Sequence, residues 1–105
     1  MIARAISRAE AEASLLTAQA EILALGVRRL ALFGSVQRDA ARADSDVDVL
    51  VEFLPGRKSY DQFLALGGLL ERVLGRPVEL VTAESLSPFL KPYILAEARD
   101  VVRAA

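Results

Sequence analysis

Apolar residues recur along the chain in blocks with different periods. In the first block, residues 2–25, they are spaced alternately four and three apart, which is the period of one helix face. This stripe consists of Ile2, Ile6, Ala9, Ala13, Leu16, Ala20 and Leu23. Ser7 followed by Glu10 predicts a capping box, and Gly26 suits the left-handed residue that ends a helix. We therefore expect a helix over residues 2–25 that packs this stripe against the protein's own sheet.

Three shorter apolar runs predict buried strands, because each is brief and ends near turn-forming residues. They span residues 27–33, 47–54 and 77–81. The polar segment between the first two predicts a short helix that Ser35 caps and that ends near Ala41.

Two further helices are expected in the second half of the chain. Residues 60–74 have helical spacing and are followed by Gly75. Ser87 and Pro88 open a last helix to about Ala98, and residues 100–103 form either an edge strand or its frayed end. The alternation of helices and strands predicts an α/β (α+β) fold, with helices packed on a small mixed sheet of three to four strands.

Length and composition narrow the chemistry. The 105 residues suffice for one hydrophobic core, so we expect a single domain over residues 1–105. The absence of Cys and His excludes a thiolate nucleophile, an imidazole base and the usual zinc site. A formal charge of −1 gives no general attraction for nucleic acid, so no direct nucleic-acid binding is expected. No stretch approaches the roughly 20 apolar residues of a membrane helix, and we expect a cytoplasmic protein with no membrane contact.

Asp46 and Asp48 open the second predicted strand. Side chains alternate along a strand, so both carboxylates project from the same face. Two adjacent negative charges are unfavourable unless a cation binds between them. The pair is therefore a candidate cation site, although an Asp-x-Asp alone often only faces solvent.

Gly34 and Ser35 form the second candidate element. They stand where a buried strand gives way to a helix, so backbone N–H groups and the Ser35 hydroxyl would form a cradle for phosphate. If the first two strands are antiparallel, the end of one lies beside the start of the next. A polyphosphate bound at Ser35 would then extend over Asp46 and Asp48.

Gly34-Ser35, separated by ten residues from Asp46-x-Asp48, resembles the signature of the DNA polymerase β nucleotidyltransferase superfamily. Ser45 before the first Asp, Phe33 before the Gly and Arg38 after the Ser fit the same pattern. The segment over residues 75–98 (GRPVELVTAESLSPFLKPYILAEA) and the short length are similar to the minimal nucleotidyltransferases (MNT). The resemblance covers roughly residues 30–100 and implies a polymerase β-like nucleotidyltransferase fold.

The resemblance also implies roles for individual residues. Gly34, Ser35 and Arg38 would bind the nucleotide, ATP. Asp46, Asp48 and Glu79 would be catalytic and would hold two Mg²⁺ ions, a cation that prefers oxygen ligands. Glu79 stands where the family usually has Asp, and its carboxylate reaches roughly 1.5 Å further. An edge-strand glutamate that only faces solvent is the alternative interpretation of Glu79.

Two smaller expectations concern the same loop. Asp39 stands where the family commonly has a small residue, and it would add negative charge near the nucleotide. Ser45 is expected to shape the turn through a local hydrogen bond rather than to touch substrate.

Three functions remain open at this point. The first is transfer of AMP to a tyrosine hydroxyl of a partner, a HEPN ribonuclease toxin, with the chain acting as antitoxin in a hetero-oligomer. The second is adenylylation of a small hydroxylated molecule such as an aminoglycoside. The third is a non-catalytic antitoxin that works by binding alone. Polymerisation on nucleic acid is disfavoured, because the chain has no basic stripe and few aromatic residues for base stacking.

Overall fold

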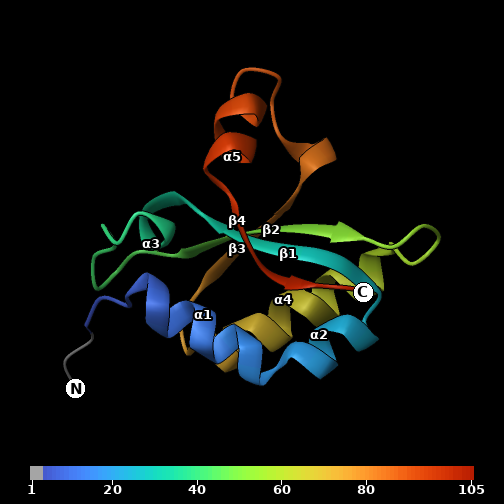
Figure 1. The fold of residues 1–105 in the computed structure, drawn as a ribbon, viewed down its shortest axis with the longest axis horizontal. Helices are drawn as coiled ribbons and strands as arrows, with labels where there is room; N and C mark the ends of the chain where they lie inside the picture. Colours follow the sequence, from blue (N-terminus) through green and yellow to red (C-terminus); the bar gives the residue numbers. More distant parts are fainter. Residues whose placement is uncertain (1–3) are drawn as a thin grey trace.

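Four strands form one mixed sheet in the order β3-β2-β1-β4 in the computed structural model, which describes residues 4–105 (Figure 1). The central strand β1 is antiparallel to both β2 and β4, whereas β2 and β3 are parallel. The strand bounds are β1 Val27–Phe33, β2 Val47–Phe53, β3 Val78–Thr82 and β4 Arg99–Arg103. The predicted fold class and the three predicted strands are confirmed.

One face of the sheet carries the main core and three helices. These are α1 (Arg8–Thr17), α2 (Gln19–Ala24) and α4 (Tyr60–Leu74), which lie together below the sheet in Figure 1. Fully buried side chains from the strands, including Val47 and Val49, meet Leu66 and Leu70 of α4. The predicted helix over residues 60–74 is confirmed. In the described chain, residues 4–105, no helix combines the length and apolarity needed to span a bilayer.

The first helix departs from its prediction. The Ser7–Glu10 capping box is present, but the helix begins only after Ser7 and breaks at Ala18. The buried stripe is Ala11, Leu15, Ala18 and Ile22, whereas Leu16 of the predicted stripe is 48% exposed. Ile2 lies outside the described residues. Both stripes have helical spacing, so the spacing alone does not decide which of them faces the sheet.

The other face carries an arm that connects β3 to β4. It comprises the short 3₁₀ helix η1 (Ala83–Ser85) and α5 (Lys91–Glu97), and α5 stands off the sheet opposite α1, α2 and α4 (Figure 1). Leu86 and Ile94 of the arm pack against a small second core of Ala31, Phe33 and Leu50. Residues 99–103 are thus an edge strand, one of the two predicted alternatives.

Two predicted helices are shorter in the structure. Helix α5 begins at Lys91, because Pro92 lacks the N–H that a helix starting at Ser87 would require. Helix α3 covers only Gly34–Gln37, and Phe33, not Ser35, is its N-cap residue. The chain leaves α3 through Asp39, which has a left-handed φ of 58°. The prediction that Ser35 caps a helix to about Ala41 is therefore wrong.

Candidate active site

The strand register brings three of the candidate positions to one end of the sheet. Phe33, the last residue of β1, pairs with Asp48 on β2. Asp48 in turn pairs with Glu79 on β3. Side chains alternate along strands, so Asp48 and Glu79 share the face that carries the arm, while Val47 and Val49 enter the main core.

Gly34 lies directly against the Asp48 carboxylate. Its φ is +72°, a left-handed conformation that glycine adopts readily. A Cβ at this position would lie 2.0 Å from Oδ2 of Asp48. The turn between β1 and α3 therefore requires glycine both for its backbone conformation and for its contact with Asp48.

The Asp48 carboxyl holds its proton more tightly than an ordinary aspartate. Partial burial is the main cause, and a hydrogen bond with Glu79 and repulsion from Glu79 and Asp46 act in the same direction. The nearby Arg38 guanidinium opposes them. Together they raise the pKa of Asp48 to about 6. Negative charge at this point is thus poorly compensated by the protein, as expected where a cation binds.

The carboxylates are of the ligand type that suits Mg²⁺, but they do not by themselves surround an ion. Asp46 and Glu79 are exposed and Asp48 is half-buried. Among residues 4–105, no three side chains of the types that bind metals are grouped closely enough to enclose an ion. Asp48 and Glu79 form the close pair, and Asp46 is near enough to act on Asp48 electrostatically. All three offer carboxylate oxygens, the ligand type that Mg²⁺ prefers.

The loop that begins at Gly34 is bonded to helix α5. The Gly34 N–H donates to Oε1 of Glu97 at 2.5 Å, and Arg38 donates to Oε2 of the same carboxylate at 2.9 Å. Glu97 is the last residue of α5. Sequence analysis missed Glu97. The contact forms only because β4 pairs with β1, and the edge strand was predicted only as one of two alternatives, without a partner strand. Ser35 is half-buried within α3, and its backbone oxygen accepts from the Ala40 N–H.

Asp39 and Ser45 have structural contacts in this loop. Oδ1 of Asp39 accepts from the Arg8 N–H at the start of α1, at 2.7 Å. The Asp39 side chain is therefore engaged by a helix N-terminus, and its left-handed φ explains why a small residue such as glycine suits this position. Oγ of Ser45 accepts from the Arg42 N–H at 2.8 Å, which confirms the predicted turn hydrogen bond.

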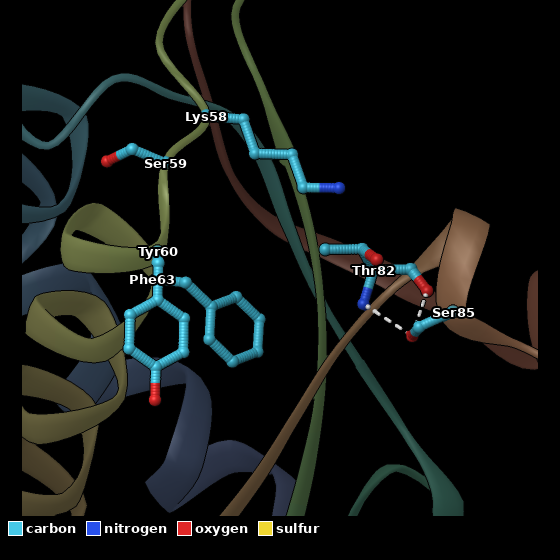
Figure 2. A pocket seen from close by; sticks show the side chains of 6 residues that line it. All are labelled: Lys58, Ser59, Tyr60, Phe63, Thr82 and Ser85. Carbon is cyan, nitrogen blue, oxygen red and sulfur yellow. Dashed lines mark hydrogen bonds between the residues drawn. The ribbon is translucent and has the colours of Figure 1, made fainter.

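A pocket of about 390 Å³ lies at the other end of β3 (Figure 2). Tyr60 and Phe63 of α4 approach it from one side, and Thr82 and Ser85 from the other. The remaining lining residues are Lys58 and Ser59. Thr82 lies three residues beyond Glu79, about 10 Å along the strand. The pocket is therefore separate from the carboxylates, which lie at the opposite end of the strands.

Comparisons with known proteins identify the family of this chain. The family described as "Nucleotidyltransferase domain" matches residues 16–101. The protein adenylyltransferase MntA of Thermococcus cleftensis is 41% identical over 88 residues, which cover 80% of this chain and 86% of that protein. A Methanocaldococcus jannaschii protein that carries the name of a protein adenylyltransferase is 43% identical over 81 residues, covering 77% and 86% of the two chains.

Solved structures show the same fold. A minimal nucleotidyltransferase superposes with a TM-score of 0.70 at 38% identity and covers 88% of this chain and 89% of its own. A toxin–antitoxin structure with AMP-PNP superposes with a TM-score of 0.69 at 19% identity, covering 89% and 73% of the two chains. At that identity the second likeness establishes fold only. The matched family, the identity to named relatives and the shared fold together show that this chain belongs to the nucleotidyltransferase family.

Proposed function

We propose that this chain is a protein adenylyltransferase that transfers AMP from ATP to a tyrosine hydroxyl of a HEPN-type toxin and thereby acts as its antitoxin. The observation that carries the proposal is the Gly34 turn packed on the Asp48 carboxylate, with Glu79 beside it on the next strand. In this proposal the Gly34 turn is the phosphate-binding loop, and its contact with Asp48 supports that role.

The comparisons support the acceptor class. Two relatives more than 40% identical bear the name protein adenylyltransferase. One structure that shares the fold, at 18% identity and a TM-score of 0.63, is a tri-AMPylated Shewanella oneidensis HEPN toxin with an MNT antitoxin. The open position of Asp46 and Glu79 also suits a protein acceptor, because a surface that lacks a surrounding pocket needs a partner to complete it. A cytoplasmic location is part of the proposal, because the proposed donor is ATP.

Each site residue then has a role in the proposed reaction. The loop amides near Ser35 and the Arg38 guanidinium bind the phosphates of ATP. Asp46, Asp48 and Glu79 would hold Mg²⁺, two ions in the proposed arrangement. When bound, Mg²⁺ supplies neutralisation of phosphate charge and lowers the pKa of the attacking hydroxyl.

The covalent step exchanges one phosphorus–oxygen bond for another. The tyrosine oxygen bonds to the α-phosphorus while the bond from that phosphorus to the pyrophosphate oxygen breaks, and pyrophosphate leaves. The hydroxyl proton passes to a carboxylate oxygen of Glu79, which is exposed and can return it to solvent. Orientation and charge compensation supply most of the acceleration.

The direct test uses α-labelled ATP, Mg²⁺ and the partner toxin. Wild type is compared with Asp46→Asn and Asp48→Asn, and with Asp44→Asn as a control in the same exposed loop. The proposal predicts labelled partner with wild type and with the control, and none with the other two variants. Equal neutralisation of the partner by all four proteins without label would instead establish an antitoxin that acts by binding. Label on a small hydroxylated acceptor but not on the partner would establish the second alternative.

A further inference from the structure

Glu97 connects the arm to the loop proposed to bind the nucleotide. One carboxylate oxygen accepts from the Gly34 N–H at 2.5 Å, and the other accepts from Arg38 at 2.9 Å. Both bonds are charge-assisted on the acceptor side, and the second is an ion pair. The Glu97 side chain is only 28% exposed, whereas that of Arg38 is 55% exposed. Glu97 is thus the more firmly held partner.

The backbone around Glu97 is fixed by the sheet. Leu32 pairs with Arg99 in the antiparallel ladder of β1 and β4. The same register, continued by two residues on each strand, places Gly34 opposite Glu97. The Ala98 N–H also donates to the Ile94 carbonyl and closes the end of α5. The Glu97 carboxylate therefore reaches the loop from a rigid support.

We propose that Glu97 is a positioning residue for nucleotide binding, which holds the Gly34 turn and aims the Arg38 guanidinium at the acidic pair. This inference rests on the proposed function in taking Gly34 and Arg38 as parts of the nucleotide loop. The Gly34 turn links Arg38 to Asp48, because Gly34 packs on the Asp48 carboxylate and its N–H shares the Glu97 carboxylate with Arg38. Glu97 consequently holds the guanidinium near the place where phosphate oxygens would meet the carboxylates.

The physical reason is conformational entropy. A free arginine side chain samples many rotamers, and binding a phosphate must then order it. The existing ion pair with Glu97, at the end of α5 where the chain enters β4, restricts those rotamers in advance. The Gly34 bond acts similarly on the backbone, because it fixes an N–H in a left-handed turn that glycine could otherwise leave.

The test measures binding of AMP-PNP with Mg²⁺ to the full chain by calorimetry. Glu97→Gln keeps an oxygen that can accept from the Gly34 N–H but loses the ion pair with Arg38. Glu97→Ala loses both contacts. Glu84→Gln is the matched control, because it breaks another ion pair of the arm, with Lys58, away from the loop. We expect affinity to fall about threefold in Glu97→Gln and about tenfold or more in Glu97→Ala, with Glu84→Gln unchanged.

A double-mutant cycle separates positioning from simple stabilisation. If Glu97 acts through Arg38, Glu97→Gln has no further effect on affinity in an Arg38→Gln background. The midpoint temperature of thermal unfolding of Glu97→Gln should match that of wild type, so the loss of nucleotide affinity would not reflect unfolding. Additive losses in the cycle would overturn the role assigned to Arg38.

Two results would overturn the proposal as a whole. Tighter nucleotide binding by either Glu97 variant would show that the carboxylate competes with phosphate, and unchanged binding would show that it is only structural. Neither result depends on the acceptor, so a wild type that binds AMP-PNP but labels no toxin would remove only the proposed acceptor. A wild type that binds no nucleotide would overturn both proposals.

Discussion

Asp48 and Glu79 are register partners on the adjacent parallel strands β2 and β3, and the Glu79 carboxylate is close enough to raise the pKa of Asp48. Partial burial is the main cause of this shift, and together with Glu79 and Asp46 it raises the pKa to about 6, so the Asp48 carboxyl keeps its proton below that pH. At higher pH the pair carries charge that the folded chain compensates poorly. A bound cation would compensate this charge. Without metal, the charge should lower the free energy of unfolding, and this loss can be measured.

The first prediction concerns the pH dependence of stability without metal. The pKa of Asp48 is about 6 when folded and near the ordinary 3.8 when unfolded. Its contribution to the free energy of unfolding is therefore fully present below pH 3.8 and is lost as pH rises through 6. Asp48→Asn stays neutral, so it should be more stable than wild type at pH 8. The expected difference is only about 1 kcal/mol, because solvent screens the half-exposed carboxylate of wild type.

Urea unfolding in EDTA at pH 5 and pH 8 checks this prediction. The advantage of Asp48→Asn should be larger at pH 8, and Asp44→Asn should track wild type at both pH values. A variant less stable than wild type at pH 8 would show that Asp48 is held as a favourable charge.

The second prediction concerns the contact between Gly34 and Asp48. Gly34→Ala places a Cβ 2.0 Å from the Asp48 carboxylate and also strains a left-handed backbone. Gly56→Ala is the matched control, because Gly56 has a φ of +76° and a Cβ added there would meet no atom within 4 Å. We expect losses in the free energy of unfolding of about 3 kcal/mol for Gly34→Ala and about 1 kcal/mol for Gly56→Ala, measured by urea denaturation. Equal losses would mean that the turn relaxes away from Asp48.

The third prediction concerns the length of the carboxylate on β3. Glu79→Asp keeps the charge and restores the residue that the family usually has, so its transfer rate should match or exceed that of wild type. Glu79→Gln loses the proposed metal ligand and proton acceptor, so its transfer rate should be at least about 100-fold lower than that of wild type. If Glu79→Asp instead loses more than about 3 kcal/mol of transition-state stabilisation relative to wild type, the longer side chain is required.

The fourth prediction tests the observed face of the first helix. Leu15 is fully buried, whereas its neighbour Leu16 is 48% exposed. Leu15→Ala should lower the free energy of unfolding by about 3 kcal/mol and Leu16→Ala by less than about 1 kcal/mol. Chemical denaturation of both variants checks this, and the reverse order would restore the stripe predicted from sequence.

Much of the architecture was predictable because the signals are local. Short apolar runs between turn residues located β1, β2 and β3. Antiparallel pairing of the first two was the assumption that brought Gly34 close to Asp48 in the expected site, and the structure shows that pairing. The first helix was mispredicted because two stripes share one spacing. Only the sheet beneath decides that Leu15 is buried and Leu16 is not.

The missed part of the candidate site depends on long-range pairing. Glu97 is 63 residues from Gly34 in the chain, and it reaches the loop only because β4 pairs with β1. Nothing in the local sequence distinguishes it from an exposed helical glutamate. Asp39 illustrates the same limit, because its partner is the start of α1, 31 residues away.

Mass spectrometry of the partner toxin after incubation with ATP and Mg²⁺ tests the central claim most directly. The account predicts that wild type adds whole AMP groups to a tyrosine of the partner and that Asp48→Asn adds none. A partner that stays unmodified with wild type, or that Asp48→Asn modifies equally well, would contradict it.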